Sequence, residues 1–169
     1  TVKEGVTQSP ELIEELKAKG VQFAFVTLHV GLGTFRPVKT ETLEEHEMHG
    51  EFVTISPETA QAINTAKAEG RRVIAVGTTT VRALEAVAHQ LPNTNFQLPS
   101  YSGDVNLFIT PGFEFKIIDG LITNFHLPKS TLLVLVSAFA GRERVLAAYK
   151  EAIEKEYRFY SFGDAMFIR

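Results

Sequence analysis

Cysteine is absent from this 169-residue sequence. Its absence excludes a disulfide framework, a thiolate nucleophile, an iron–sulfur cluster and a cysteine-based zinc site. It also favours the cytosol over an oxidising compartment. Long apolar runs are lacking too, since the longest one, residues 132–140, covers only half of the roughly 20 residues that a membrane-spanning helix needs. We therefore expect a cytoplasmic protein that makes no membrane contact.

A strong excess of charge of either sign is also missing. The chain carries 17 Lys and Arg against 20 Asp and Glu, a net charge of −3, so no overall field draws it to a polyanion. Any nucleic-acid contact must then be local, through basic groups of the C-terminal segment. These groups are Arg142, Arg144, Lys150 and Arg158. The alternative is that they belong to ordinary solvated helix faces.

The composition is that of a globular domain, with 44% hydrophobic and 22% charged residues. Strand-like and helix-like segments alternate along the chain and are separated by Gly and Pro residues. This alternation predicts an α/β fold with a mixed β-sheet flanked by helices on both faces. Helix start and stop signals place the helices as follows. We expect them at residues 10–20, 57–70, 78–89, 131–140 and 142–157.

Two continuous apolar segments, residues 21–30 and 73–76, predict strands buried on both faces. Asp119-Gly120 stands between two β-like runs, residues 113–118 and 121–125, which predicts a β-hairpin with a type I′ turn. Residues 90–104 are rich in turn formers and predict a loop. Residues 105–109 look β-like, and the aromatic tail, residues 159–168, is expected to pack back onto the core.

The first chemical candidate is TLHVGLGTFRP, residues 27–37. A strand there delivers His29, and Gly31 and Gly33 let backbone amides approach a ligand closely. The segment lacks the third glycine of a dinucleotide-binding motif. The alternative is a tight strand exit in which Arg36 pairs with a carboxylate.

Two histidines, His46 and His49, form the second candidate. Zinc-protease motifs place their histidines four residues apart, whereas these lie three apart, and no third ligand is identified. We therefore expect no metal. The two imidazoles can still share one helix face and meet one ligand.

The third and fourth candidates are strand-to-helix turns. In VGTTTVR, residues 76–82, the amides of Thr78 and Thr79 at a helix start suit a carboxylate or phosphate, unless one Thr merely caps the helix. In TNFHLPKS, residues 123–130, Asn124, His126 and Lys129 crowd between apolar neighbours, which is costly unless they bond to each other or to a ligand. A satisfied structural turn is the alternative reading.

The sequence resembles the S-adenosylmethionine:tRNA ribosyltransferase-isomerases of queuosine biosynthesis. The resemblance rests on TLHVGLGTFRPV (27–38), HEMH (46–49) with Glu51, VGTTTVRALE (76–85), ITPGFEF (109–115), DGLITNFHLPKSTLLVLVSAFAGR (119–142) and YRFYSFGDAMFI (157–168). It runs from residue 11 onward, and family members are roughly twice as long. Residues 1–169 are therefore expected to be one portion of the S-adenosylmethionine-binding catalytic domain. The family's N-terminal part and inserted β-rich domain would be absent, and a chain break is expected within residues 2–9.

The resemblance implies a reaction in which the ribosyl moiety of S-adenosylmethionine is transferred and isomerised. Its acceptor is 7-aminomethyl-7-deazaguanine at the wobble position of the tRNA anticodon loop, and the products are epoxyqueuosine-tRNA, adenine and methionine. No metal and no cofactor beyond the cosubstrate are implied, and a monomer is expected. The competing interpretation is a non-catalytic RNA- or ligand-binding module, followed by a metal-assisted hydrolase.

Such a reaction needs a general base, an acid for adenine and a pocket for the methionine carboxylate. The implied catalytic residues are His126, His49, His46, His29 and Asp164. The implied substrate-binding residues are Arg36, Gly31, Gly33, Thr78, Thr79, Arg82, Asn124 and Lys129. Asp164 would bind the substrate amine or ribose hydroxyls, although Asp beside Gly is commonly a turn former. We expect Arg36, His126 and Thr78 to line one cleft, because strand exits in α/β sheets gather ligand contacts.

Overall fold

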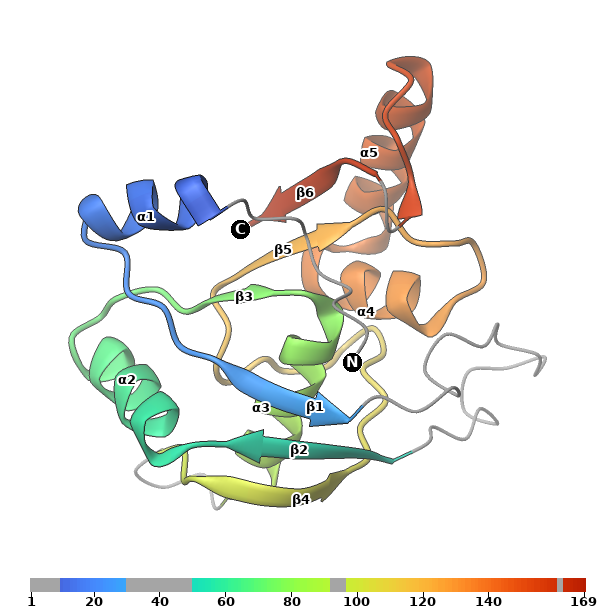
Figure 1. Cartoon of the computed structure of the whole chain (residues 1–169). Coiled ribbons are helices and arrows are strands. Elements are labelled where there is room, and N and C mark those ends of the chain that lie inside the picture. Colours follow the sequence, from blue (N-terminus) through green and yellow to red (C-terminus); the bar gives the residue numbers. More distant parts are fainter. Residues whose placement is uncertain (1–9, 30–49, 92–96, 161–162) are drawn as a thin grey trace.

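The computed structural model describes residues 10–29, 50–91, 97–160 and 163–169. Over these residues the chain has an α/β fold, as predicted, with two three-stranded sheets (Figure 1). The helices are α1 (Pro10–Ala18), α2 (Pro57–Ala68), α3 (Thr78–His89), α4 (Thr131–Ala140) and α5 (Arg142–Glu154). The strands are β1 (Val26–His29), β2 (Glu51–Ile55), β3 (Ile74–Val76), β4 (Tyr101–Val105), β5 (Gly120–Asn124) and β6 (Ala165–Ile168).

The two sheets differ in the direction of their strands. The sheet β1-β2-β4 is antiparallel throughout. The sheet β3-β5-β6 is mixed, because β3 runs parallel to β5 while β6 runs antiparallel to it. Figure 1 shows the succession β6, β5, β3, β1, β2, β4 across the molecule. The tail therefore packs back onto the core as the end strand β6, which confirms that prediction.

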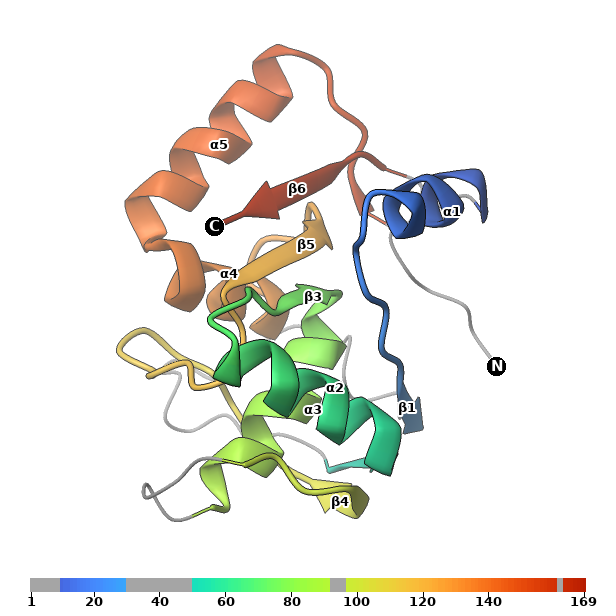
Figure 2. The same ribbon diagram turned by 90° about the vertical axis from the view of Figure 1, so that its left-hand side faces the viewer.

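Helix α3 forms the centre of the core. It contacts β3 and β5 of one sheet, β1 and β4 of the other, and α4. Nearly all of its residues are buried, including Val81, Leu84 and Val87. The two views place α1 and α5 on either side of β6, and α1 has no buried residue (Figures 1 and 2). The two sheets are thus joined chiefly through one buried helix.

The local helix signals act as the sequence predicts. Ser56 Oγ accepts a hydrogen bond from Thr59 N at 3.2 Å at the start of α2, and Ser130 Oγ accepts one from Leu133 N at 3.2 Å at the start of α4. Gly141, at φ 87°, separates α4 from α5. These signals work because a side-chain oxygen satisfies an amide that the first helical turn leaves unpaired.

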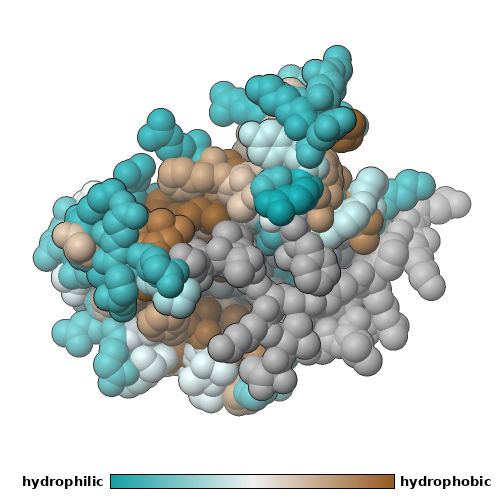
Figure 3. Space-filling model, turned by 45° about the horizontal axis from the view of Figure 1, so that its top comes forward, coloured by the Kyte–Doolittle hydropathy of each residue, from teal (hydrophilic) through white to brown (hydrophobic). Residues whose placement is uncertain are grey.

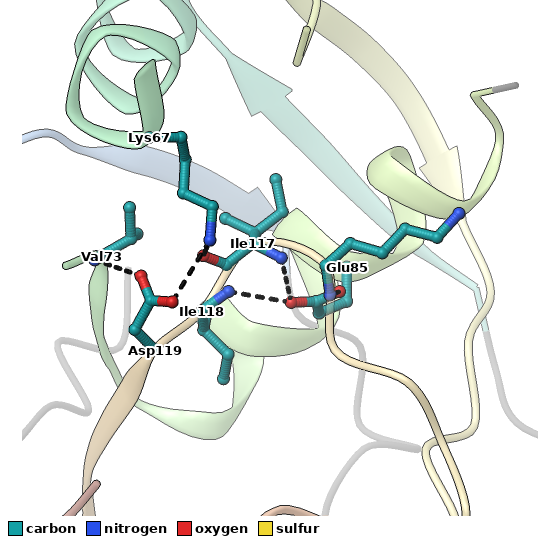
Figure 4. Close-up of polar contacts among 7 residues, drawn as sticks. Lys67, Val73, Glu85, Ile117, Ile118 and Asp119 are labelled. Atoms are coloured by element: carbon teal, nitrogen blue, oxygen red, sulfur yellow. Dashed lines mark hydrogen bonds and ion pairs between the residues drawn. The ribbon is translucent and has the colours of Figure 1, made fainter. Parts of the chain in front are cut away.

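The predicted β-hairpin at Asp119-Gly120 is wrong. Residues 113–118 form no strand, and β5 pairs with β3 and β6 instead. The buried carboxylate of Glu85 accepts hydrogen bonds from the amides of Lys116, Ile117 and Ile118, at 2.9, 2.9 and 3.1 Å (Figure 4). Those amides therefore point at a helix side chain rather than at a partner strand.

The predicted burial of residues 21–30 on both faces is also wrong. Of the described residues 21–29, only Val26–His29 forms a strand. It lies at an edge of its sheet, and its residues alternate between half-buried and exposed. Phe25, just before it, is 73% exposed. Strand β3 is likewise an edge strand, with Ala75 buried but both its neighbours only half-buried. Hydrophobicity alone did not distinguish an edge strand from a central one.

The segment expected to be a loop, residues 90–104, ends in most of β4. Tyr101–Val105 pairs with the whole of β2, itself a strand that the sequence analysis did not predict. Of the β-like run 105–109, only Val105 is in a strand. Strand β4 contains Ser102, Gly103 and Asp104, so its pairing arises from the neighbouring strand rather than from strong strand propensity.

Candidate functional site at one edge of the sheets

The candidate residues that the structure describes gather at one edge of the sheets. In Figure 1 the strands β1, β3 and β5 point to the same side, where β2 and β6 begin. We call this side the strand-end edge. It carries His29 at the end of β1, Thr78, Thr79 and Arg82 after β3, Asn124, His126 and Lys129 at and after the end of β5, and Asp164 before β6. Thr78 and His126 therefore lie at the same edge, whereas the prediction that they line one cleft with Arg36 stays a prediction, because Arg36 lies outside the described residues.

Helix α3 starts at this edge without a side-chain cap. Gly77 has φ 89° and donates its amide to Ile122 O of β5 at 2.8 Å, so the helix begins directly beside that strand. Thr80 Oγ1 bonds back to Val76 O at 2.8 Å and does not cap the helix. The proposed Thr cap is thus absent. The first amides of α3, with the positive end of the helix dipole, are arranged to meet an anion.

Arg82 is buried in an ion pair rather than open to a ligand. Its guanidinium Nη2 contacts the Glu51 carboxylate at the start of β2, and the two side chains are only 6% and 1% exposed. The other terminal nitrogen, Nη1, has no hydrogen-bond partner in the described parts of the chain. The expectation that Arg82 binds substrate directly is untested. What the structure shows is a buried link between α3 and β2.

His126 is half-buried in the turn between β5 and α4. Its Nε2 lies 3.0 Å from Thr123 Oγ1, and its backbone amide donates to the Tyr149 hydroxyl at 2.7 Å. Burial lowers the pKa of His126 to about 4, because the charged imidazolium loses its solvation. The ring is therefore neutral at physiological pH. Sequence reasoning missed Thr123 as a partner within its own motif, and Tyr149 is too distant for any local signal.

Asp164 and Asn124 are occupied by structural contacts. The Asp164 carboxylate accepts from Arg158 N at 2.8 Å and from Arg158 Nη2 at 3.1 Å, which lowers the pKa of Asp164. Asn124 Nδ2 donates to Tyr160 O at 3.1 Å. Asp164 thus holds the turn that precedes β6, as the turn-former alternative expected.

Lys129 and His29 are exposed at the same edge, and the His29 ring lies 5.8 Å from that of Phe52.

Aromatic rings back the turn that carries His126. The Phe125 ring is 4% exposed and lies 4.8 Å from the Phe159 ring and 5.3 Å from the Tyr149 ring, centre to centre. These rings therefore build a rigid wall. Apolar residues are exposed elsewhere on the molecule, and Figure 3 shows apolar surface between hydrophilic regions. The exposed large apolar side chains include Leu12, Val21, Phe25, Ile153 and Phe167.

Several predictions fall on residues outside the described ranges. They concern Gly31, Gly33, Arg36, His46 and His49, together with the expected break within residues 2–9. The described residues on either side, His29 and Gly50, both lie at the strand-end edge. Within the described ranges, no cluster of three or more His, Cys, Asp or Glu side chains could hold a metal ion. No helix there is long and apolar enough to cross a membrane.

Comparison with known proteins gives one consistent result. The family model described as queuosine biosynthesis protein matches residues 3–168. Proteins named S-adenosylmethionine:tRNA ribosyltransferase-isomerase from Heliobacterium modesticaldum and Carboxydothermus hydrogenoformans are 60% and 63% identical over 164 residues, which is 97% of this chain and 47% of each relative. The crystal structure of S-adenosylmethionine tRNA ribosyltransferase from Thermotoga maritima matches with a TM-score of 0.78 and 49% identity, over 96% of this chain and 50% of that one.

The match is therefore long in this chain but partial in its relatives. The chain spans about half the length of the curated relatives that it matches. Within that half, the fold is similar to that of the Thermotoga maritima structure, and the family model covers all the motifs on which the sequence resemblance rests. The chain belongs to the queuosine biosynthesis protein family.

Proposed function

We propose that this chain forms the larger part of the active site of an S-adenosylmethionine:tRNA ribosyltransferase-isomerase. The observation that carries the proposal is the identity of 60% and 63% to proteins of that name over 97% of the chain. The proposed acceptor is 7-aminomethyl-7-deazaguanine at the tRNA wobble position. The proposed products are epoxyqueuosine-tRNA, adenine and methionine, formed in the cytoplasm by a monomer with no cofactor beyond S-adenosylmethionine.

The start of α3 is the proposed site for the methionine carboxylate. The uncapped amides of Thr78 and Thr79 supply donors, and the dipole of a 12-residue helix adds positive potential. Arg36, which lies outside the described residues, is proposed to add a cationic contact to the carboxylate. Arg82 contributes by position, because its pair with Glu51 holds the N-terminal half of α3 against β2.

The histidines divide between two roles in this proposal. His126 is neutral at pH 7, so it serves as a hydrogen-bonding group and not as the acid that protonates adenine. A pKa of about 4 also makes the His126 ring a weak base, so the base that removes a proton beside the sulfonium, and the acid, are proposed to be among His29, His46 and His49. Asp164 supports the site by holding its turn, and Asn124 and Lys129 flank the substrate.

The tRNA contact is proposed to be local. Arg142 and Arg144 are exposed at the start of α5, and Lys129 is exposed in the turn before α4. Lys150 and Arg158 are exposed too but lie near carboxylates, Glu154 at 3.9 Å and Asp164 at 3.1 Å. The first three therefore offer phosphate contacts without losing an ion pair within the described residues.

The decisive experiment measures adenine release. The full-length protein that carries this sequence is incubated with S-adenosylmethionine and tRNA bearing the deazaguanine, and adenine and the modified nucleoside are quantified by chromatography. Equal amounts of both products are expected. Thr79→Asp should raise KM for S-adenosylmethionine at least about tenfold, because it puts a negative charge beside the carboxylate site. Thr79→Asn is the matched neutral control.

Two other outcomes would overturn the proposal. Binding of tRNA without adenine release would favour the non-catalytic RNA-binding module. Release that a chelator abolishes and a divalent metal restores would favour the metal-assisted hydrolase.

A further inference from the structure

The two ring nitrogens of His126 have different surroundings. Nε2 is 3.0 Å from Thr123 Oγ1. Nδ1 makes no hydrogen bond with the described residues. In the described part of the chain, three side-chain atoms are both buried and without a hydrogen-bond partner, and Nδ1 is not one of them. Nδ1 is therefore not fully enclosed, and His126 lies in the turn at the strand-end edge. The question of which nitrogen carries the proton decides whether Nδ1 donates or accepts.

The surroundings of Thr123 answer this question. Its side chain lies on β5, it is 1% exposed, and His126 Nε2 is the only hydrogen-bond partner of its hydroxyl within the described residues. If the hydroxyl accepted from Nε2–H, its own proton would be buried without an acceptor, at a cost of about 1–3 kcal/mol. If it donates, the donor is satisfied and only a lone pair is left over. A neutral imidazole that accepts at Nε2 carries its proton on Nδ1.

A second contact restrains the same residue. The backbone amide of His126 donates to the Tyr149 hydroxyl at 2.7 Å, and the Tyr149 ring packs edge-on against Phe125. Tyr149 of α5 thus restrains the backbone of the turn, and Thr123 of β5 restrains the imidazole ring. Rotation of the imidazole would break the Thr123 contact and leave a buried hydroxyl unpaired.

We propose that Thr123 is a positioning residue that holds His126 in the Nδ1–H tautomer, so that the ring presents an N–H donor at the strand-end edge. A histidine in this state neither takes a proton at Nδ1 nor carries a positive charge. It recognises an acceptor atom, such as a hydroxyl or carbonyl oxygen or an unprotonated ring nitrogen of a ligand. The inference concerns the tautomer and does not depend on the reaction proposed above.

The test is nitrogen NMR of the whole chain labelled with ¹⁵N-histidine, near pH 7 and without ligand. Loss of one signal set in His126→Gln assigns the resonances of His126. In the wild type, Nδ1 should resonate as a protonated, pyrrole-type nitrogen and Nε2 as an unprotonated, pyridine-type nitrogen. Thr123→Ser keeps the hydroxyl and should keep this pattern. Thr123→Val, which has nearly the same shape, should move both signals toward the averaged values of mixed tautomers.

Three results would overturn the proposal. They are a proton on Nε2 in the wild type, the wild-type pattern in Thr123→Val, and a Thr123→Ser spectrum that matches that of Thr123→Val. Circular dichroism establishes that the variants are folded. If Thr123→Val fails to fold, the wild-type and Thr123→Ser spectra still decide between the tautomers, because each reports directly which nitrogen is protonated.

Discussion

At the scale of single residues, two acidic side chains organise the chain around the site, the buried Glu85 and the exposed Asp119. Glu85 is fully buried, and its two oxygens accept three consecutive backbone amides from residues 116–118. On the same segment, Asp119 accepts from Val73 N at 2.8 Å and pairs with Lys67 at 3.2 Å (Figure 4). These contacts set the position of β5, and hence of the turn with His126, relative to α3.

Replacement of Glu85 by Gln should destabilise the protein by about 2–3 kcal/mol. The change removes the charge that strengthens three buried hydrogen bonds and puts an amide donor where an acceptor is needed. Urea unfolding followed by circular dichroism measures the loss. Glu154→Gln on α5, whose side chain is 63% exposed, is the control and should change stability by less than about 0.5 kcal/mol. Equal effects of the two variants would contradict the assigned role of Glu85.

His126 should make stability depend on pH. Its pKa is about 4 in the folded state against 6.5 ordinarily, so between these values the unfolded chain binds more protons. Stability should therefore fall as the pH drops from about 6.5 to 4, by at most about 3 kcal/mol, and this contribution should level off at lower pH. His126→Gln should lose this part of the slope in pH-dependent urea titrations. His29→Gln, at an exposed position, should keep it.

At the scale of elements, α3 is held to β2 by the buried pair of Arg82 and Glu51, and β5 is held between two partner strands. Both arrangements bring together residues distant in the chain. Both arrangements also tolerate few substitutions, because buried charges need their partners and a central strand has neighbours on either side.

For the buried pair, Arg82→Met alone should cost about 3–5 kcal/mol because it leaves the Glu51 carboxylate buried without its cation. The double variant Glu51→Leu with Arg82→Met removes both charges and should be more stable than Arg82→Met. Thermal and urea unfolding of the two variants and the wild type test this order. A double variant less stable than the single one would show that the pair is not the dominant interaction of either side chain.

For β5, Gly120→Ala should destabilise the mixed sheet by about 1–3 kcal/mol. An added Cβ would lie 2.7 Å from Ile74 Cδ1 and 3.2 Å from Ile168 O. Ile74→Val removes the nearer atom, so the double variant should recover part of the loss caused by Gly120→Ala. Denaturant midpoints of the two variants provide the comparison, and no recovery would locate the strain at β6 instead.

At the scale of the whole molecule, one buried helix connects two small sheets. Helix α3 contacts strands of both sheets, and its apolar face supplies much of the shared core. Three-stranded sheets bury little by themselves, so each depends on α3. The strand-end edge contains residues of both sheets, so its order depends on α3.

Leu84→Ala should accordingly weaken both sheets together. Leu84 is 3% exposed on α3, and its truncation should cost about 3 kcal/mol. Hydrogen exchange should show lower protection in β2 and in β5 to a similar extent. Ile153→Ala, at a 66% exposed position of α5, serves as the control and should leave both unchanged. Loss confined to one sheet would mean that the two sheets unfold independently.

The sequence by itself determined the local features of this protein. Ser56, Ser130 and Gly141 begin and separate helices through contacts within four residues, so their effect is readable in the chain. The α/β order also followed from the sequence. The strands that precede Thr78 and His126 end at one edge because β3 and β5 are parallel, but whether the two residues share a cleft with Arg36 stays a prediction. The tertiary structure alone decided which polar groups are buried and with which partners.

The failed predictions all depend on such distant partners. Glu85 and its amides are 31–33 residues apart, and their contact replaced the hairpin that Asp119-Gly120 indicates locally. The pairing of β4 with β2 and the edge position of β1 likewise depend on neighbours across the fold. A turn signal is worth about 1 kcal/mol or less, whereas a buried charge left without partners costs several, so the distant contacts prevail.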